Sequence, residues 1–117
     1  MKVWHAIAAA CRASHDAFRA ALSDPAEAQA AQLRAVLAAN AASDTGRRYA
    51  FGAMRGWNDY RAAVPVTGYA DIAADLARMA AGGRGGLTSE PAVACEVTSG
   101  SGGAAKQVPY TAAGLAA

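Results

Sequence analysis

The chain has 117 residues, a length that is enough for one small domain, and its net charge is +2. Hydrophobic residues make up 54% of it, but alanine supplies more than half of that fraction, so we expect a thin core. Eleven basic residues are nearly matched by nine acidic ones, which argues against a charge-driven nucleic-acid binder. No run approaches the roughly 20 uncharged apolar residues that a membrane span needs, so no membrane association is predicted.

The two cysteines, Cys11 and Cys95, stand far apart in the chain. Small secreted domains usually carry more cysteines, so we expect a reducing, cytoplasmic location. A small-residue run that ends at Cys11 has some features of a lipoprotein signal, but its apolar stretch is shorter than the roughly 7–15 residues required. The first helix of a cytoplasmic protein is favoured instead. His5 and His15 have no carboxylate or thiol partners at metal-ligand spacing, so no metal site is predicted.

Two helices are predicted in the first third of the chain. Residues 2–22 contain no Gly or Pro and place several apolar side chains near one side of a helix. A second helix is expected to begin at Pro25 and to run to about Asn40, with Asp24 as its cap. Glu27 can complete a capping box with that aspartate.

Residues 43–66 differ in character and form a predicted connector. A turn signal, Ser43-Asp44-Thr45-Gly46, opens the connector. Half of the aromatic residues of the chain follow within a dozen positions, namely Tyr49, Phe51, Trp57 and Tyr60. Beside neighbouring arginines these rings could form a platform for single-stranded nucleic acid. A small packed core is favoured, because no repeated pattern orders the rings and Asp59 interrupts the basic character.

A third helix and a strand are predicted farther along the chain. Within residues 67–82 the helical spacing is carried by Tyr69, Ile72, Leu76 and Met79. The pair Gly82-Gly83 ends this helix. From Ala92 the apolar period changes to two, which predicts a short strand. The strand leads into a glycine-rich loop, and the two together span residues 92–110.

The glycine-rich segment is the part of the sequence whose composition demands a chemical explanation. It consists of Thr98-Ser99-Gly100-Ser101-Gly102-Gly103-Ala104-Ala105-Lys106. Such loops present consecutive backbone N–H groups to a phosphate, because no Cβ stands in the way. The hydroxyls can add donors, and Lys106 can add a positive charge. The chain has nine arginines and only two lysines, so a lysine here stands out. A plain flexible turn is the alternative.

Two common nucleotide motifs fit this segment poorly. A P-loop of the NTPase type needs G-x-x-x-x-G-K-[ST], and counted from Gly100 the chain offers Ala105 for the last glycine and Gln107 for the hydroxyl residue. A dinucleotide fingerprint is formally present in the same loop, but Pro109 would interrupt the helix that it needs.

A third motif fits better, because the segment looks like the S-G-[ST]-[ST]-G-x-x-K phosphate loop of adenylate-forming enzymes. It departs from that pattern at Gly102, where a second hydroxyl is usual. Three flanking stretches extend the likeness in matching order and spacing: Asn40–Phe51; Trp57–Asp71, with Asp59-Tyr60-Arg61, Val64-Pro65-Val66 and Tyr69-Ala70-Asp71; and Glu90–Thr111, ending in Lys106-Gln107-Val108-Pro109-Tyr110-Thr111. With these stretches the chain resembles the auxin-conjugating acyl-acid amido synthetases of the Gretchen Hagen type, especially their bacterial relatives.

The resemblance implies a mixed α/β fold, in which amino-terminal helices lead to the first strand and the phosphate loop of a large adenylate-forming domain. It also implies a ligase that uses MgATP to activate a carboxylic acid as an acyl-adenylate and then transfers the acyl group to an amine or amino acid. ATP and Mg²⁺ are therefore the expected cofactors, while the catalytic residues stay unidentified. The residues expected to contact the ATP phosphates are Thr98, Ser99, Gly100, Ser101, Gly102, Gly103 and Lys106.

Adenylate-forming enzymes run to several hundred residues, so we interpret the chain as an incomplete amino-terminal part of one such domain. By itself it is expected to be inactive and poorly folded, because its strand lacks partners. Thr111 is expected to cap a final helix. The predicted parts are a helical region 1–42, a connector 43–66, a helix 67–82, and a strand with its glycine loop 92–110. The alternative is a stand-alone helical interaction module whose glycine loop is only a turn.

Overall fold

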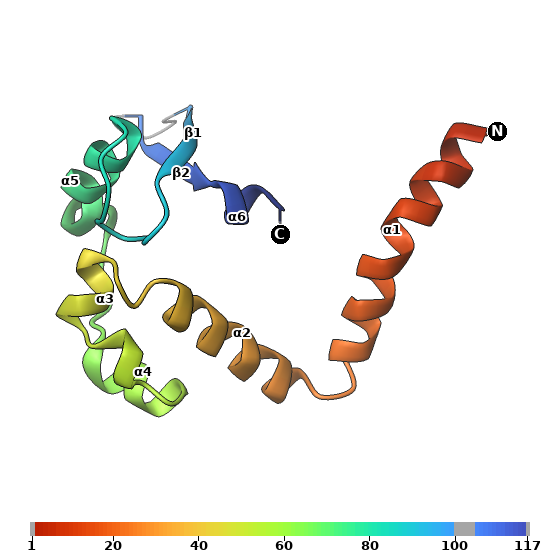
Figure 1. The fold of residues 1–117 in the computed structure, drawn as a ribbon, viewed down its shortest axis with the longest axis horizontal. Coiled ribbons are helices and arrows are strands. Elements are labelled where there is room, and N and C mark those ends of the chain that lie inside the picture. The colour runs from red at the N-terminus through yellow and green to blue at the C-terminus, as the bar shows by residue number, and fades with distance from the viewer. Residues whose placement is uncertain (1, 100–104, 117) are drawn as a thin grey trace. The chain divides into compact units, whose positions relative to one another are not determined.

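The computed structural model describes residues 2–99 and 105–116 (Figure 1). Within these ranges the chain forms six α-helices, one short 3-10 helix and a two-stranded antiparallel sheet. This confirms the mixed α/β class expected from the sequence. The chain divides into two compact units, Met1–Leu33 and Arg34–Ala117, with the boundary inside a helix.

The first unit contains α1 (Lys2–Ala21) and the beginning of α2 (Pro25–Ala39). The Oδ1 atom of Asp24 accepts the backbone N–H of Glu27 at 3.0 Å, which is the cap expected at this helix start. The two helices predicted from periodicity and capping are therefore confirmed to within one residue at each end. No helix in the described ranges is both long and apolar enough to cross a bilayer.

Three short helices occupy the segment predicted as a connector: α3 (Asp44–Arg48), η1 (Phe51–Ala53) and α4 (Trp57–Ala63). The predicted turn at residues 43–46 is in fact the start of α3. Ser43 is fully buried there, and its Oγ atom accepts the N–H of Gly46 at 2.8 Å. Turns and helix starts both use a short side-chain oxygen to bond a nearby backbone N–H. The same residues therefore suit both structures.

The aromatic residues of this region pack against one another, as predicted for a small core. The Phe51 ring is buried, and its centroid lies 6.5 Å from the centroids of both Tyr49 and Tyr60. Trp57 stacks on Tyr60 with a centroid distance of 6.0 Å. Because Trp57 is still 59% exposed, this core is open on one side.

The helix α5 (Tyr69–Ala80) packs on the hairpin formed by β1 (Ala92–Val97) and β2 (Gln107–Thr111). Leu76 and Met79, both from the predicted apolar stripe, are buried in α5. In the sheet Val97 lies opposite Gln107, and a bulge between Ala92 and Ala94 shifts the register. The predicted helix and the predicted strand are thus present.

The second strand, β2, was not predicted, so the expectation that β1 lacks a partner strand was wrong. Pro109 lies in the middle of β2, opposite Cys95 of β1. A proline weakens any strand prediction because it cannot donate a hydrogen bond to a ladder. It is tolerated here because both strands of a two-stranded sheet are edge strands. After β2, the Oγ1 atom of Thr111 accepts the N–H of Gly114 at 3.1 Å and caps α6 (Ala112–Ala116), as predicted.

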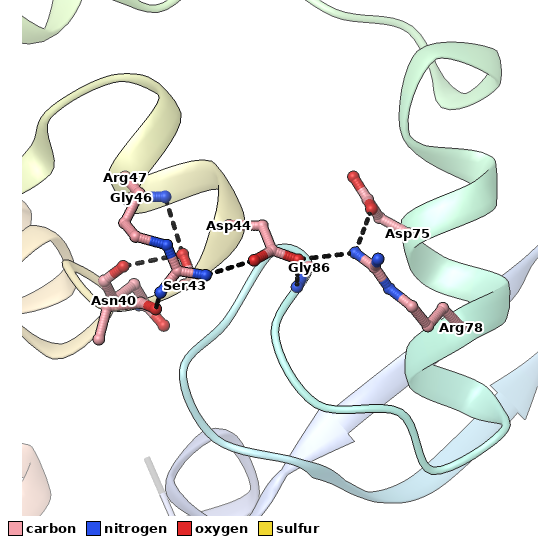
Figure 2. A network of polar contacts seen from close by, with 9 residues as sticks. Asn40, Ser43, Asp44, Gly46, Arg47, Asp75, Arg78 and Gly86 are labelled. Atoms are coloured by element: carbon pink, nitrogen blue, oxygen red, sulfur yellow. Dashed lines mark hydrogen bonds and ion pairs between the residues drawn. The ribbon is translucent and has the colours of Figure 1, made fainter.

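The carboxylate of Asp44 joins three segments of the second unit (Figure 2). Its Oδ2 atom accepts the Gly86 N–H and an Arg78 Nη2–H, each at 3.0 Å, and its Oδ1 atom pairs with Arg47 Nη2 at 2.5 Å. The N–H of Thr45 donates a hydrogen bond to the Gly86 carbonyl at 3.1 Å. Gly86 has φ +72, a backbone conformation that favours glycine. The start of α3, this loop and α5 are therefore linked by one side chain.

A second link holds the segment that leads into β1. The Oδ1 atom of Asn40 accepts the N–H of Ser89 at 3.1 Å, and the Asn40 carbonyl accepts the hydroxyl of Ser43 at 2.8 Å. The loop between α5 and β1 is thus bonded at Gly86 and again at Ser89. Asp44 accepts the first of these bonds and Asn40 accepts the second.

The close approach of the chain at Gly46 generates the first prediction. A Cβ at this position would collide with the Asn40 carbonyl oxygen and would lie 2.9 Å from the carbonyl carbon of Ala41. We expect Gly46→Ala to lower the free energy of unfolding, measured by urea denaturation, by about 3 kcal/mol, although alanine favours helices.

Gly52→Ala is the matched control for this substitution. A Cβ at Gly52 would meet only the Cβ of Ala41, at an ordinary 3.8 Å. Its free energy of unfolding should stay within about 0.5 kcal/mol of the parent protein. Equal stability of the two variants would contradict the close packing of α3 on residues 40 and 41.

The Asp44 network generates a prediction about pH. The N–H of Gly86, assisted by the guanidinium groups of Arg78 and Arg47, holds the pKa of Asp44 below its ordinary value of 3.8. Unfolding restores the ordinary pKa, so the unfolded state takes up the proton first as the pH falls. The stabilisation by Asp44 is therefore complete above the ordinary pKa and is lost as the pH falls through the folded pKa.

Denaturant unfolding at about pH 7 and about pH 3 tests whether the stabilisation by Asp44 is lost on acidification. We expect Asp44→Asn to be less stable than the parent protein at neutral pH and to lose less stability on acidification. Asp16→Asn, at an exposed site on α1, should follow the parent protein at both pH values. A parallel pH response in the parent protein and Asp44→Asn would rule out this contribution.

Candidate functional site

The glycine-rich segment connects β1 to β2, and its two ends are hydrogen-bonded to each other. The N–H of Thr98 donates to the Lys106 carbonyl at 2.9 Å. In return, the Oγ1 atom of Thr98 accepts the Lys106 N–H at 3.1 Å. These bonds extend the hairpin ladder beyond the Val97–Gln107 pair. We call this arrangement the Thr98–Lys106 clamp.

The structure describes three of the seven residues predicted to contact phosphate, namely Thr98, Ser99 and Lys106, and all three are exposed. It brings Thr98 and Lys106 together across the hairpin, and Ser99 follows directly on Thr98. The other four, Gly100, Ser101, Gly102 and Gly103, lie outside the described residues. Their phosphate contacts therefore stay predictions from the sequence.

The side chain of Lys106 lies over an aromatic ring. Its Nζ atom is 5.3 Å from the centroid of Tyr69. Within residues 2–99 and 105–116, Lys106 forms no ion pair with a carboxylate. An aromatic face attracts a cation without neutralising it. The ammonium charge of Lys106 is therefore available to an anion.

Tyr69 is the functional residue that the sequence analysis missed. It is half-buried at the first position of α5, and its hydroxyl oxygen accepts the backbone N–H of Gln107 at 3.0 Å. From the sequence it was placed on the apolar stripe of a helix and in one of the stretches that carry the family resemblance, with no contact to Lys106. A tyrosine in such a stripe does carry a signal, because its hydroxyl usually finds a hydrogen-bond partner when the ring is buried.

A cavity of about 290 Å³ lies between α5 and β2. Its walls are largely apolar and include Leu76, Met79 and Pro109, while Thr98 and Lys106 also line it. Two residues predicted to contact phosphate, Thr98 and Lys106, therefore line one largely apolar cavity. A larger cavity, of about 520 Å³, lies beside Tyr49, Phe51 and Tyr60, and none of the described phosphate contacts lines it.

A side-chain bond also ties the two strands. The hydroxyl of Tyr110 donates to Glu96 Oε2 at 2.8 Å. This hydrogen bond and the charge of Glu96 raise the pKa of Tyr110, because ionisation would place two negative charges side by side. The hairpin that carries the glycine-rich segment is thus fixed by main-chain and side-chain bonds.

The Mg²⁺ ion implied by the resemblance finds no ready set of protein ligands here. Across the described ranges no group of three or more His, Cys, Asp or Glu side chains is placed to hold a metal ion. Magnesium in phosphate sites commonly keeps waters and takes phosphate oxygens, with only one or two carboxylates.

The Thr98–Lys106 clamp generates a prediction about local stability. Thr98→Val keeps the shape of the side chain but removes the oxygen that accepts the Lys106 N–H. We expect amide hydrogen exchange at Lys106, followed by NMR, to become roughly five- to tenfold faster, as for the loss of one ordinary hydrogen bond. Thr98→Ser retains the hydroxyl and should exchange at the parent rate. Unchanged exchange in Thr98→Val would show that the hydroxyl does not hold the loop.

The comparisons with known proteins identify one family. The family model for the GH3 family N-terminal domain matches residues 14–117. All three stretches that carried the sequence resemblance, within residues 40–111, lie inside this match. No curated protein and no solved structure matches the chain significantly.

Proposed function

This chain belongs to the GH3 family of auxin-responsive acyl-acid amido synthetases, and we propose that it forms the ATP phosphate-binding part of such an enzyme. In the proposed reaction a carboxylate attacks the α-phosphate of MgATP, which gives an acyl-adenylate and releases pyrophosphate. The amine of a second substrate, typically an amino acid, then attacks the acyl carbon. An amide forms, and AMP and a proton leave.

The observation that carries this proposal is the Thr98–Lys106 clamp. It joins the two ends of a glycine-rich segment. At one of these ends it places the ammonium of Lys106, which has no carboxylate partner among the described residues. Transfer of an adenylyl group requires stabilisation of the charge that develops on the departing pyrophosphate. Lys106 supplies a positive charge for this purpose.

The residues between the two ends complete the proposed phosphate site. Backbone N–H groups from Gly100 to Gly103, together with the hydroxyls of Ser99 and Ser101, act as donors to phosphate oxygens in this proposal. Gly102 offers no hydroxyl where related loops have one, so one donor fewer is expected. Thr98 also belongs to the proposed site, because its hydroxyl oxygen accepts the Lys106 N–H and its own O–H is still a donor.

Activity of the isolated chain is not part of the proposal. The matched family model is itself that of an N-terminal domain. We propose that the 117-residue chain is inactive alone and works within a longer protein in a cytoplasmic, reducing location. Cys11 and Cys95 are both free, which supports that location.

The source DNA beyond the codon for Ala117 tests the first part of this proposal. An open frame of several hundred codons would support a complete ligase. An immediate stop codon would contradict it and would favour a stand-alone interaction module, for which α1 offers exposed apolar side chains such as Trp4 and Phe18.

Exchange of pyrophosphate into ATP, dependent on the carboxylic acid, tests the chemistry in the complete protein. We expect Lys106→Ala to lower the exchange rate by roughly 10²-fold, because a group that stabilises the transition state is removed. Ser101→Ala should also lower it. Lys2→Ala, at the other lysine of the chain, is the matched control and should leave it unchanged. Near-parental exchange in both Lys106→Ala and Ser101→Ala would refute the phosphate site.

A further inference from the structure

We propose that Tyr69 is a positioning residue that holds Lys106 in place for phosphate through two separate contacts. The ring of Tyr69 lies under the ammonium, and its hydroxyl oxygen bonds the backbone next to the lysine. This inference rests on the proposed function of the glycine-rich segment. It adds a residue from α5 that lies outside that segment in the sequence.

The first contact fixes the backbone beside Lys106. Successive N–H groups of a strand point to opposite sides. The N–H of Lys106 points toward β1, where Thr98 accepts it, so the N–H of Gln107 points away from β1. The Tyr69 hydroxyl accepts this outward N–H at 3.0 Å. The start of β2 is therefore held from both sides.

The second contact restricts the lysine side chain. A lysine has a flexible four-carbon stem, so its ammonium ordinarily samples many positions. The Tyr69 ring attracts the ammonium at 5.3 Å from the centroid, within the usual range of a cation–π contact. An aromatic face, unlike a carboxylate, leaves the three N–H donors of the ammonium free. It orients Lys106 and keeps all of its donors for phosphate oxygens.

Tyr69 can perform this role because α5 is itself firmly placed. The Oδ2 atom of Asp71 accepts the Gly68 N–H at 2.8 Å and caps the beginning of the helix. Farther along α5, Arg78 bonds Asp44 at 3.0 Å. Tyr69 also lines the 290 Å³ cavity together with buried Leu76 and Met79. The ring is thus carried by a helix that is capped at its start and bonded to Asp44 near its end.

Two substitutions separate the contacts. Tyr69→Phe keeps the ring and removes only the acceptor for Gln107, whereas Tyr69→Leu removes both contacts and keeps an apolar side chain. In the complete enzyme we expect exchange of pyrophosphate into ATP to fall roughly fivefold in Tyr69→Phe and more in Tyr69→Leu. Tyr60→Phe, at a half-buried tyrosine in the aromatic core, is the matched control and should be unaffected.

A double-mutant cycle with Lys106→Ala distinguishes positioning from a general structural role. If Tyr69 acts through Lys106, Tyr69→Phe causes no further loss of exchange in the Lys106→Ala background. Losses that multiply would overturn the inference while the proposed phosphate site stands. An unchanged rate in Lys106→Ala would overturn the inference, and an unchanged rate in Ser101→Ala as well would overturn the proposed site.

NMR of the lysine side chains gives a readout that does not depend on activity. The chain has two lysines, so after reductive ¹³C-methylation Lys2 serves as the internal reference. The ring current of Tyr69 should shift the Lys106 methyl signal in the parent protein and in Tyr69→Phe, and the shift should vanish in Tyr69→Leu. An identical Lys106 signal in the parent protein and Tyr69→Leu would refute the ring contact.

Discussion

The carboxylate of Asp44 is the interaction on which the placement of the candidate site depends. It bonds Gly86 in the loop before β1 and Arg78 on α5, and these partners are far from it in the sequence. Through Arg78 it fixes the helix that begins at Tyr69, and Tyr69 in turn contacts the segment around Lys106. A buried serine at position 43 starts the helix that presents this carboxylate. The placement of the site therefore depends on this polar network together with the buried Leu76 and Met79 of α5.

The candidate site is organised by support from outside the glycine-rich segment. The Thr98–Lys106 clamp joins the ends of the segment, and Tyr69 holds the lysine end from the side of α5. A phosphate loop gains rate from donors that are already in place before the charge develops. The bonds between Thr98 and Lys106 are in place before a nucleotide binds, so their ordering cost does not fall on binding.

Local signals predicted the helices well, because periodicity and the Asp24 cap act over a few neighbouring residues. The ordered motifs also led to the correct family, which the match over residues 14–117 confirms. Long-range features were not predictable in this way. Nothing near Asp44 specifies a partner at Gly86, and nothing near Tyr69 specifies a bond to Gln107. Pro109 concealed β2, since a proline is tolerated in an edge strand but also disfavours a strand prediction.

The hydroxyl of Tyr69 has a consequence for how the sheet can grow. It occupies the outward N–H of Gln107, which an added strand would otherwise use to pair with β2. Among the described residues no strand pairs with the far side of β1. At Gln107 a further strand beside β2 would have to displace the bond to Tyr69. The tyrosine that contacts Lys106 thereby also covers one donor on the free edge of β2.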